Sequence, residues 1–174
     1  FEVTAEMVED SKVGKIKSRA NIFATSYNRT REKFAANLIY GGTGEKISFA
    51  GKEYSTLSAD GKPLFSKEHT SITGGCDVQS NIFKNAFSVS VMDAMQEAMQ
   101  KFTDDDGNLL NVAPDTIIIP NSGALKRAVF EAVGSDLDPN SNNNAVNFQM
   151  GLCNVLVWNY LTSTIGGNPY FMML

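Results

Sequence analysis

Residues 16–42 read IKSRANIFATSYNRTREKFAANLIYGG, a stretch that carries a helical pattern of apolar side chains. Its apolar side chains recur at steps that place them on one face of a helix, namely Ile16, Ala20, Phe23, Tyr27, Phe34 and Leu38. Gly41 and Gly42 then supply the left-handed stop that glycine adopts most readily. The pattern predicts a helix of about seven turns over residues 16–40. A helix of that length needs a partner surface, because its stability comes mainly from packing.

Basic residues gather in and just before this helix. Residues 1–87 contain 12 Lys and Arg against 10 Asp and Glu, whereas residues 88–174 contain 3 against 9, so the halves carry +2 and −6 and the chain −4. A solvated or subunit-facing surface is favoured over a nucleic-acid-binding one, since the isoelectric point of about 5.0 argues against a dedicated DNA-binding domain. The candidate inter-subunit contacts are Lys12, Lys15, Lys17, Arg19, Arg29, Arg31 and Lys33.

Downstream of the helix, helices and strands mix without strict alternation. The pattern predicts a long polar connection over 43–85 that contains a short strand at 46–49. A helix is predicted after the capping box Ser90–Asp93, followed by a buried strand at 116–119. A second helix, capped by Asn121 or Ser122 and ended by Gly134, is followed by strands at 155–161 and 170–174. Such a mixture indicates an α+β fold.

Candidates for catalysis or metal binding are few. His69 is the single histidine, and Cys76 follows it across a Gly-rich stretch, so a Cys–His hydrolase is one alternative. Their spacing matches no nucleophile signature, and a loop histidine bonded to the backbone is the favoured interpretation. Asp104–Asp106 is interpreted as an exposed acidic turn, because Gly107 comes too early for a calcium-binding loop. We therefore predict no catalytic, cofactor-binding or metal-binding residue, no cofactor and no enzyme activity.

Four blocks carry a resemblance to a known family. The stretch Asp60–Thr70, followed by Gly74-Gly75 and Ser80-Asn81, resembles the major head (capsid) subunit of Mu-like tailed phages and prophages. The other three blocks agree in order and are residues 1–10, residues 29–38, and residues 114–120 continued by 151–162. The resemblance covers nearly the whole chain, and its most specific part is the run Leu64-Phe65-Ser66 with His69.

The resemblance implies a fold, a function and a set of partners. The fold is the α+β tailed-phage major capsid fold, with a peripheral lobe (1–87) holding the spine helix and long polar loop, an axial lobe (88–165) and a return strand (166–174). The function is that of a structural subunit that self-assembles into an icosahedral head enclosing DNA. Its partners are copies of itself, with a scaffold or a protease during assembly, no membrane, and DNA only as enclosed cargo. Assembly is expected in the bacterial cytoplasm, and the product is the virion capsid.

Alternatives of other classes stay open beside this one. A nanocompartment shell shares the fold but encloses an enzyme, and a nucleic-acid-binding module would use the basic helix. The N-terminal arm and extended loop that precede the spine helix in relatives are not recognisable. From the chain's start at Phe1 and its apolar end at 172–174 we expect a piece of a longer polypeptide, and because the arm and loop are not recognisable we expect this piece by itself to be monomeric or weakly associated.

Overall fold

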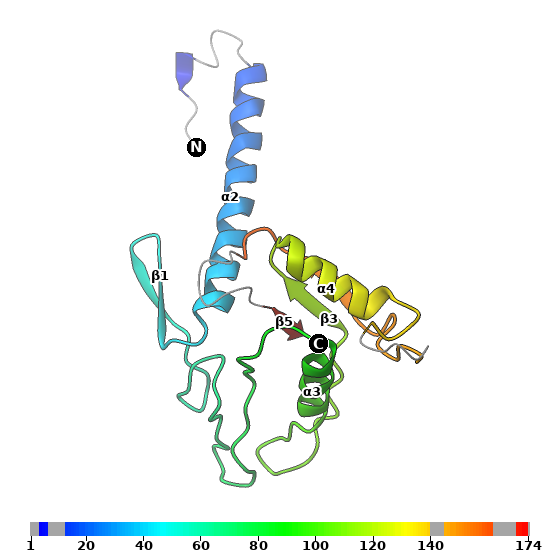
Figure 1. Ribbon diagram of the computed structural model, residues 1–174. Helices are drawn as coiled ribbons and strands as arrows, with labels where there is room; N and C mark the ends of the chain where they lie inside the picture. The colour runs from blue at the N-terminus through cyan, green and yellow to red at the C-terminus, as the bar shows by residue number, and fades with distance from the viewer. Residues whose placement is uncertain (1–3, 7–12, 140–144, 162–169, 174) are drawn as a thin grey trace.

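The computed structural model describes residues 4–6, 13–139, 145–161 and 170–173. Figure 1 shows a long helix that projects from a body made of a small sheet, two further helices and extended loops. The elements follow in the order α2 (Val13–Gly41), β1 (Lys46–Phe49), β2 (Lys52–Ser55), α3 (Val89–Gln100), β3 (Thr116–Ile119), α4 (Gly123–Gly134), β4 (Asn154–Val157) and β5 (Phe171–Met173). The α+β class is confirmed.

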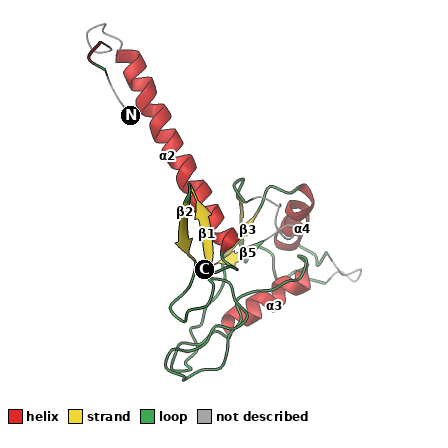
Figure 2. Cartoon of the chain, turned by 90° about the vertical axis from the view of Figure 1, so that its left-hand side faces the viewer, coloured by secondary structure: helices red, strands yellow, loops and turns green. Residues whose placement is uncertain are grey.

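Helix α2 confirms the predicted long helix and has 29 residues. Its first two thirds stand away from the body in both views (Figures 1 and 2), and residues 17–33 are exposed. Only the last turns pack, where Ala36 is buried and Phe34 and Leu38 are half-buried. The apolar stripe therefore extends beyond the surface that the chain's own body provides.

The hairpin of β1 and β2 packs against the base of α2. Its two-residue loop is Ala50-Gly51, both with positive φ (50° and 77°), as a tight hairpin turn requires. The Phe34 ring lies edge-on to Phe49 at 5.3 Å and to Tyr54 at 5.1 Å between centroids. The predicted strand at 46–49 is confirmed. β2 was not expected from the sequence, because all its residues are exposed and it lacks an alternating apolar pattern.

The second sheet has the order β4-β3-β5, with β3 parallel to β4 and antiparallel to β5. The strand predicted at 116–119 is confirmed, and β5 confirms the core of the one predicted at 170–174. The strand predicted over 155–161 was too long, since β4 ends at Val157. Beyond it the chain turns, the Leu161 N–H donating to the Trp158 carbonyl at 3.2 Å. Trp158 and Leu161 leave the sheet because their side chains pack beside the base of α2.

Strand β3 is buried on both faces and joins two apolar clusters. Ile117 and Ile119 pack with side chains from α3 and α4, including Met92, Leu125 and Val129. Ile118, which points to the opposite face, packs with Ala36 of α2 and with Leu161. Burying each such side chain contributes about 1.5–3 kcal/mol. One short strand thus fixes the helix pair to the base of the projecting helix.

The start of α3 differs from the prediction. The N-cap is Ser88, whose extended backbone lets its Oγ accept from the Val91 N–H at 3.2 Å. The capping box expected at Ser90–Asp93 was therefore placed two residues late, because Ser90 already lies inside the helix. α4 begins after Ser122 and ends at Gly134 as expected, although the Ser122 side chain makes no capping hydrogen bond.

The long polar connection 56–87 is tied to the turn that follows α3. The Gln79 side chain makes two hydrogen bonds to the backbone of Thr103. Its Nε2 donates to the Thr103 carbonyl at 3.0 Å, and its Oε1 accepts from the Thr103 N–H at 2.9 Å. The Thr73 hydroxyl donates to the Asp105 carbonyl at 2.9 Å. A Cβ built on Gly75 would overlap that same carbonyl, so only glycine fits the approach.

Candidate interaction surfaces

The projecting part of α2 presents the predicted basic side chains to solvent. Lys12 lies outside the described residues, whereas the other six of the seven are exposed on this helix, namely Lys15, Lys17, Arg19, Arg29, Arg31 and Lys33. Between them Tyr27 is 58% exposed, and the Arg31 guanidinium lies over its ring at 5.8 Å from the centroid. The helix therefore offers positive charge combined with aromatic surface.

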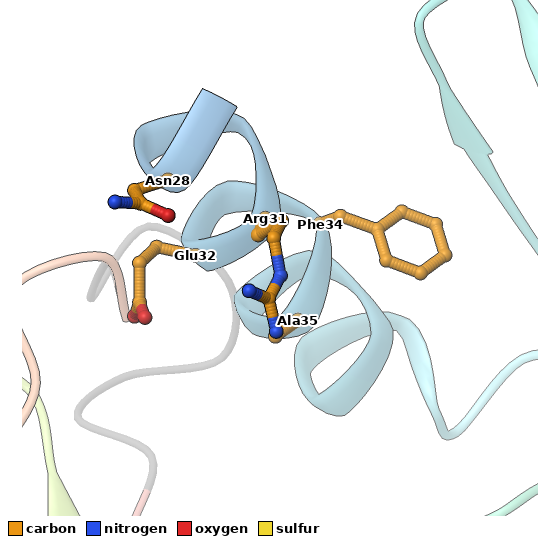
Figure 3. A pocket seen from close by; sticks show the side chains of 5 residues that line it. All are labelled: Asn28, Arg31, Glu32, Phe34 and Ala35. Atoms are coloured by element: carbon orange, nitrogen blue, oxygen red, sulfur yellow. The ribbon is translucent and has the colours of Figure 1, made fainter. Parts of the chain in front are cut away.

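Glu32 is the acidic residue within this basic stretch, and it holds the helix to the body. Its Oε2 accepts a hydrogen bond from Trp158 Nε1 at 2.7 Å. Beside it lies a surface hollow of about 360 Å³, whose described lining is Asn28, Arg31, Glu32, Phe34 and Ala35. Figure 3 shows that these five side chains all come from α2, Phe34 pointing to one side and Asn28 and Glu32 to the other. Neither His69 nor Cys76 belongs to this lining.

A second surface was not expected from the sequence and lies between α4 and β4. Four apolar side chains are exposed there and are called the apolar strip, namely Val146 (80% exposed), Phe148 (67%), Met150 (53%) and Leu152 (54%). The polar residues between them are buried, with Asn147 at 5% and Gln149 at 0% exposure. This arrangement reverses the usual one, in which apolar side chains face inward.

Hydrogen bonds from the buried amides hold the strip in this orientation. Asn147 Nδ2 donates to the carbonyls of Ala132 at 2.7 Å and Ser135 at 2.8 Å, which satisfies acceptors at the C-terminal end of α4. Gln149 Nε2 donates to Asp93 Oδ1 at 2.5 Å and to Gln96 Oε1 at 2.6 Å on α3. The sequence does carry a signal for the apolar strip, because polar and apolar residues alternate over 146–150.

The structure gives His69 and Cys76 different partners. His69 Nδ1 lies 2.8 Å from Asp60 Oδ2, and the His69 backbone pairs with that of Gln79. Cys76 Sγ instead accepts from Gln79 Nε2 at 3.4 Å. No hydrogen bond joins this histidine and this cysteine, both of which are described. The expected backbone partner for the ring was wrong, because a carboxylate takes that place.

Asp60 organises the turn in which this pair lies. The Lys62 N–H and the Ser58 hydroxyl donate to its Oδ1 at 3.0 and 2.8 Å, and the Thr70 N–H donates to Oδ2. These bonds, that of Lys62 first, hold the pKa of Asp60 far below its ordinary value. The block that carries the family resemblance is thus a hydrogen-bonded turn around one carboxylate.

The acidic turn after α3 is closed by its own hydrogen bonds. Asp104 accepts from the side chain of Asn108 and from the N–H groups of Asp106 and Asn108, and the Asn108 bonds chiefly lower its pKa. Within 4–6, 13–139, 145–161 and 170–173, no group of three or more His, Cys, Asp and Glu is placed to hold a metal ion. Of the helices in those ranges, none combines the length and the apolar character needed to cross a bilayer.

Comparison with known proteins identifies the family. Residues 1–174 match the family described as phage capsid protein. No curated protein and no solved structure shows significant similarity to the chain. The match spans every element described above, and it confirms the expectation raised by the sequence blocks at the level of phage capsid proteins. The chain therefore belongs to the phage capsid protein family, and it is a structural subunit of a phage head.

Proposed function

We propose that this chain is the major head subunit of a Mu-like phage or prophage, that copies of it assemble in the bacterial cytoplasm into an icosahedral shell around DNA, and that it carries no enzyme activity. The observation that carries the proposal is the exposure of residues 17–33, which make up more than half of the 29-residue helix α2. An isolated helical stretch in water is marginally stable, so such a helix needs packing partners. Neighbouring subunits supply them.

One apolar cluster supports the axial lobe of the proposed two-lobe division. Residues 88–165 form the axial lobe around the cluster of α3, β3 and α4, and residues 1–87 form the peripheral lobe with α2 and the long polar loop. The return strand toward the peripheral lobe is proposed over 166–174; of its described residues, Phe171 lies in the cluster at the base of α2, and β5 pairs with β3. A shell subunit needs repeated, fixed contacts, and symmetry multiplies each weak one.

The basic side chains of α2 are the proposed contacts to a neighbouring copy. Residues 88–174 carry 9 acidic against 3 basic side chains, so the two parts attract one another between subunits. A scaffold or a protease takes part during assembly. The net negative charge of residues 88–174 also keeps the assembled shell from adhering to the DNA that it encloses.

Electron microscopy of the protein expressed from its complete gene tests the proposal. We expect closed shells. Shells recovered from bacteria in which the prophage has been induced should contain DNA rather than an enzyme. Reversing the charge of Lys15, Lys17 and Arg19 together should abolish them, whereas C76A should leave them unchanged. Shells that package an enzyme would establish a nanocompartment instead, and a hydrolytic activity lost in C76A would contradict the absence of enzyme function.

A further inference from the structure

The apolar strip is built to face outward. Turning this segment over would bury Phe148 and Met150, but it would also remove Asn147 and Gln149 from their acceptors on α4 and α3. A buried amide that loses its partners is destabilising. The structure thus holds four apolar side chains of one seven-residue segment in solvent, and exposed apolar surface that gathers in this way marks an interaction site.

The charge of the chain segment that contains the strip indicates the kind of surface to which it binds. Residues 131–161 contain three acidic side chains, among them the exposed Glu131 and Asp136, and no Lys, Arg or His. Residues 13–33 of α2 contain six Lys and Arg against one acidic residue, together with the exposed Tyr27. Both surfaces combine apolar side chains with charge, and their charges are opposite.

The two surfaces cannot meet within one chain. The Gly151 N–H bonds to the Val133 carbonyl at 2.9 Å, which places the strip at the C-terminal end of α4. Figure 1 shows this end of α4 pointing away from α2, and Figures 1 and 2 both show the projecting end of α2 extending away from the body. A contact between them therefore joins two copies.

We propose that the apolar strip of one subunit is the docking surface for the projecting part of α2, around Tyr27, of a second copy. The inference rests on the proposed function and adds the surface through which neighbours associate. Because the two surfaces differ, the contact is head-to-tail, and repetition of it generates rings or extended arrays rather than isolated dimers. Anchored side chains make the strip preorganised, so docking does not require the segment to rearrange.

Polar substitution in the strip is the first test, made in the protein expressed from its complete gene. F148S/M150S should reduce the yield of particles at least about tenfold, because the centre of an apolar contact carries most of its binding energy. The matched control is L109S, which changes a side chain that is 69% exposed elsewhere. Both variants should unfold at the temperature of the wild type. Normal particles from F148S/M150S, beside a wild type that forms shells, would overturn the docking surface and leave the proposed function intact.

Cysteine pairing is the second test, and it does not depend on particle yield. With Cys76 replaced by Ser, Y27C/M150C should form a ladder of covalent multimers under mild oxidation, and Y27C or M150C alone should not. Dimers from M150C alone would show that the strip docks on itself and would overturn the proposal. The absence of cross-links in assembled particles would do the same. A wild type that forms no shells would instead refute the proposed function.

Discussion

Trp158 Nε1 donates a hydrogen bond of 2.7 Å to Glu32 Oε2, which connects the projecting helix to the end of β4 across 126 positions of sequence. The pair lies beside the cluster of Ala36, Ile118 and Leu161. It therefore ties α2, at the point where the helix leaves the body, to the chain just beyond β4.

Removing the bond should cost stability and change how α2 is held. Trp158→Phe keeps an aromatic side chain and removes the donor, while Glu32→Ala removes the acceptor, and each should lower the free energy of unfolding by about 1–2 kcal/mol. Urea denaturation of both and of the double variant checks this. The double variant should lose less than the sum of the two single losses, because both remove the same bond. Strictly additive losses would show that the two side chains do not interact.

A second prediction concerns the anchor of the apolar strip. Asn147→Ala removes both hydrogen bonds to the carbonyls at the end of α4 and leaves the buried acceptor of Ala132 and the part-buried acceptor of Ser135 without this partner. The free energy of unfolding should fall by about 1–3 kcal/mol, and exchange of the Gly151 amide hydrogen should become faster. Asn159→Ala, at an exposed position, is the control and should change stability by less than about 0.5 kcal/mol. Equal effects of the two substitutions would contradict the anchoring role.

These features separate what the sequence predicts from what it does not. Helices α2 and α4 were predicted because their apolar residues recur at helical spacing, and strand β3 was predicted because its apolar run is continuous. The run from Val155 to Leu161 has strand-forming residues throughout, yet β4 ends at Val157 because Trp158 finds its partner on α2. Contacts with such distant residues override local preference and cannot be read from a window of sequence.

The interaction surfaces were predicted only in part. The basic side chains were found because charge clustering is visible in the sequence, and six of them are exposed on α2. The apolar strip was missed because Asn147 and Gln149 look like surface residues, and their burial depends on acceptors that α3 and α4 bring to them. The role of Glu32 was hidden for the same reason.

Glycine at position 75 is predicted to be essential for the contact between the long polar loop and the turn after α3. Gly75→Ala would place a Cβ against the Asp105 carbonyl, which belongs to backbone and cannot rotate away. Stability should fall by about 1–3 kcal/mol, and proteolysis within 56–87 should accelerate. Gly123→Ala is the matched control, since nothing lies within 4 Å of its added Cβ and α4 favours alanine. A Gly75→Ala variant as stable as the wild type would show that the loop does not need this approach.

The final prediction is a pH dependence that originates at Asp60. Hydrogen bonds from Lys62, Ser58, His69 and Thr70 lower the pKa of this carboxyl in the folded chain, whereas in the unfolded chain it titrates at its ordinary value of 3.8. The folded state therefore binds this proton less readily, so the group stabilises the fold above pH 3.8 and its contribution is lost as the pH falls toward the folded value. Asp60→Asn removes this contribution. Unfolding measured from pH 7 to pH 2 should show wild type more stable than Asp60→Asn at neutral pH, with the gap narrowing below about pH 4. A gap that stays constant down to pH 2, or that widens, would show that the Asp60 carboxylate does not hold this turn together.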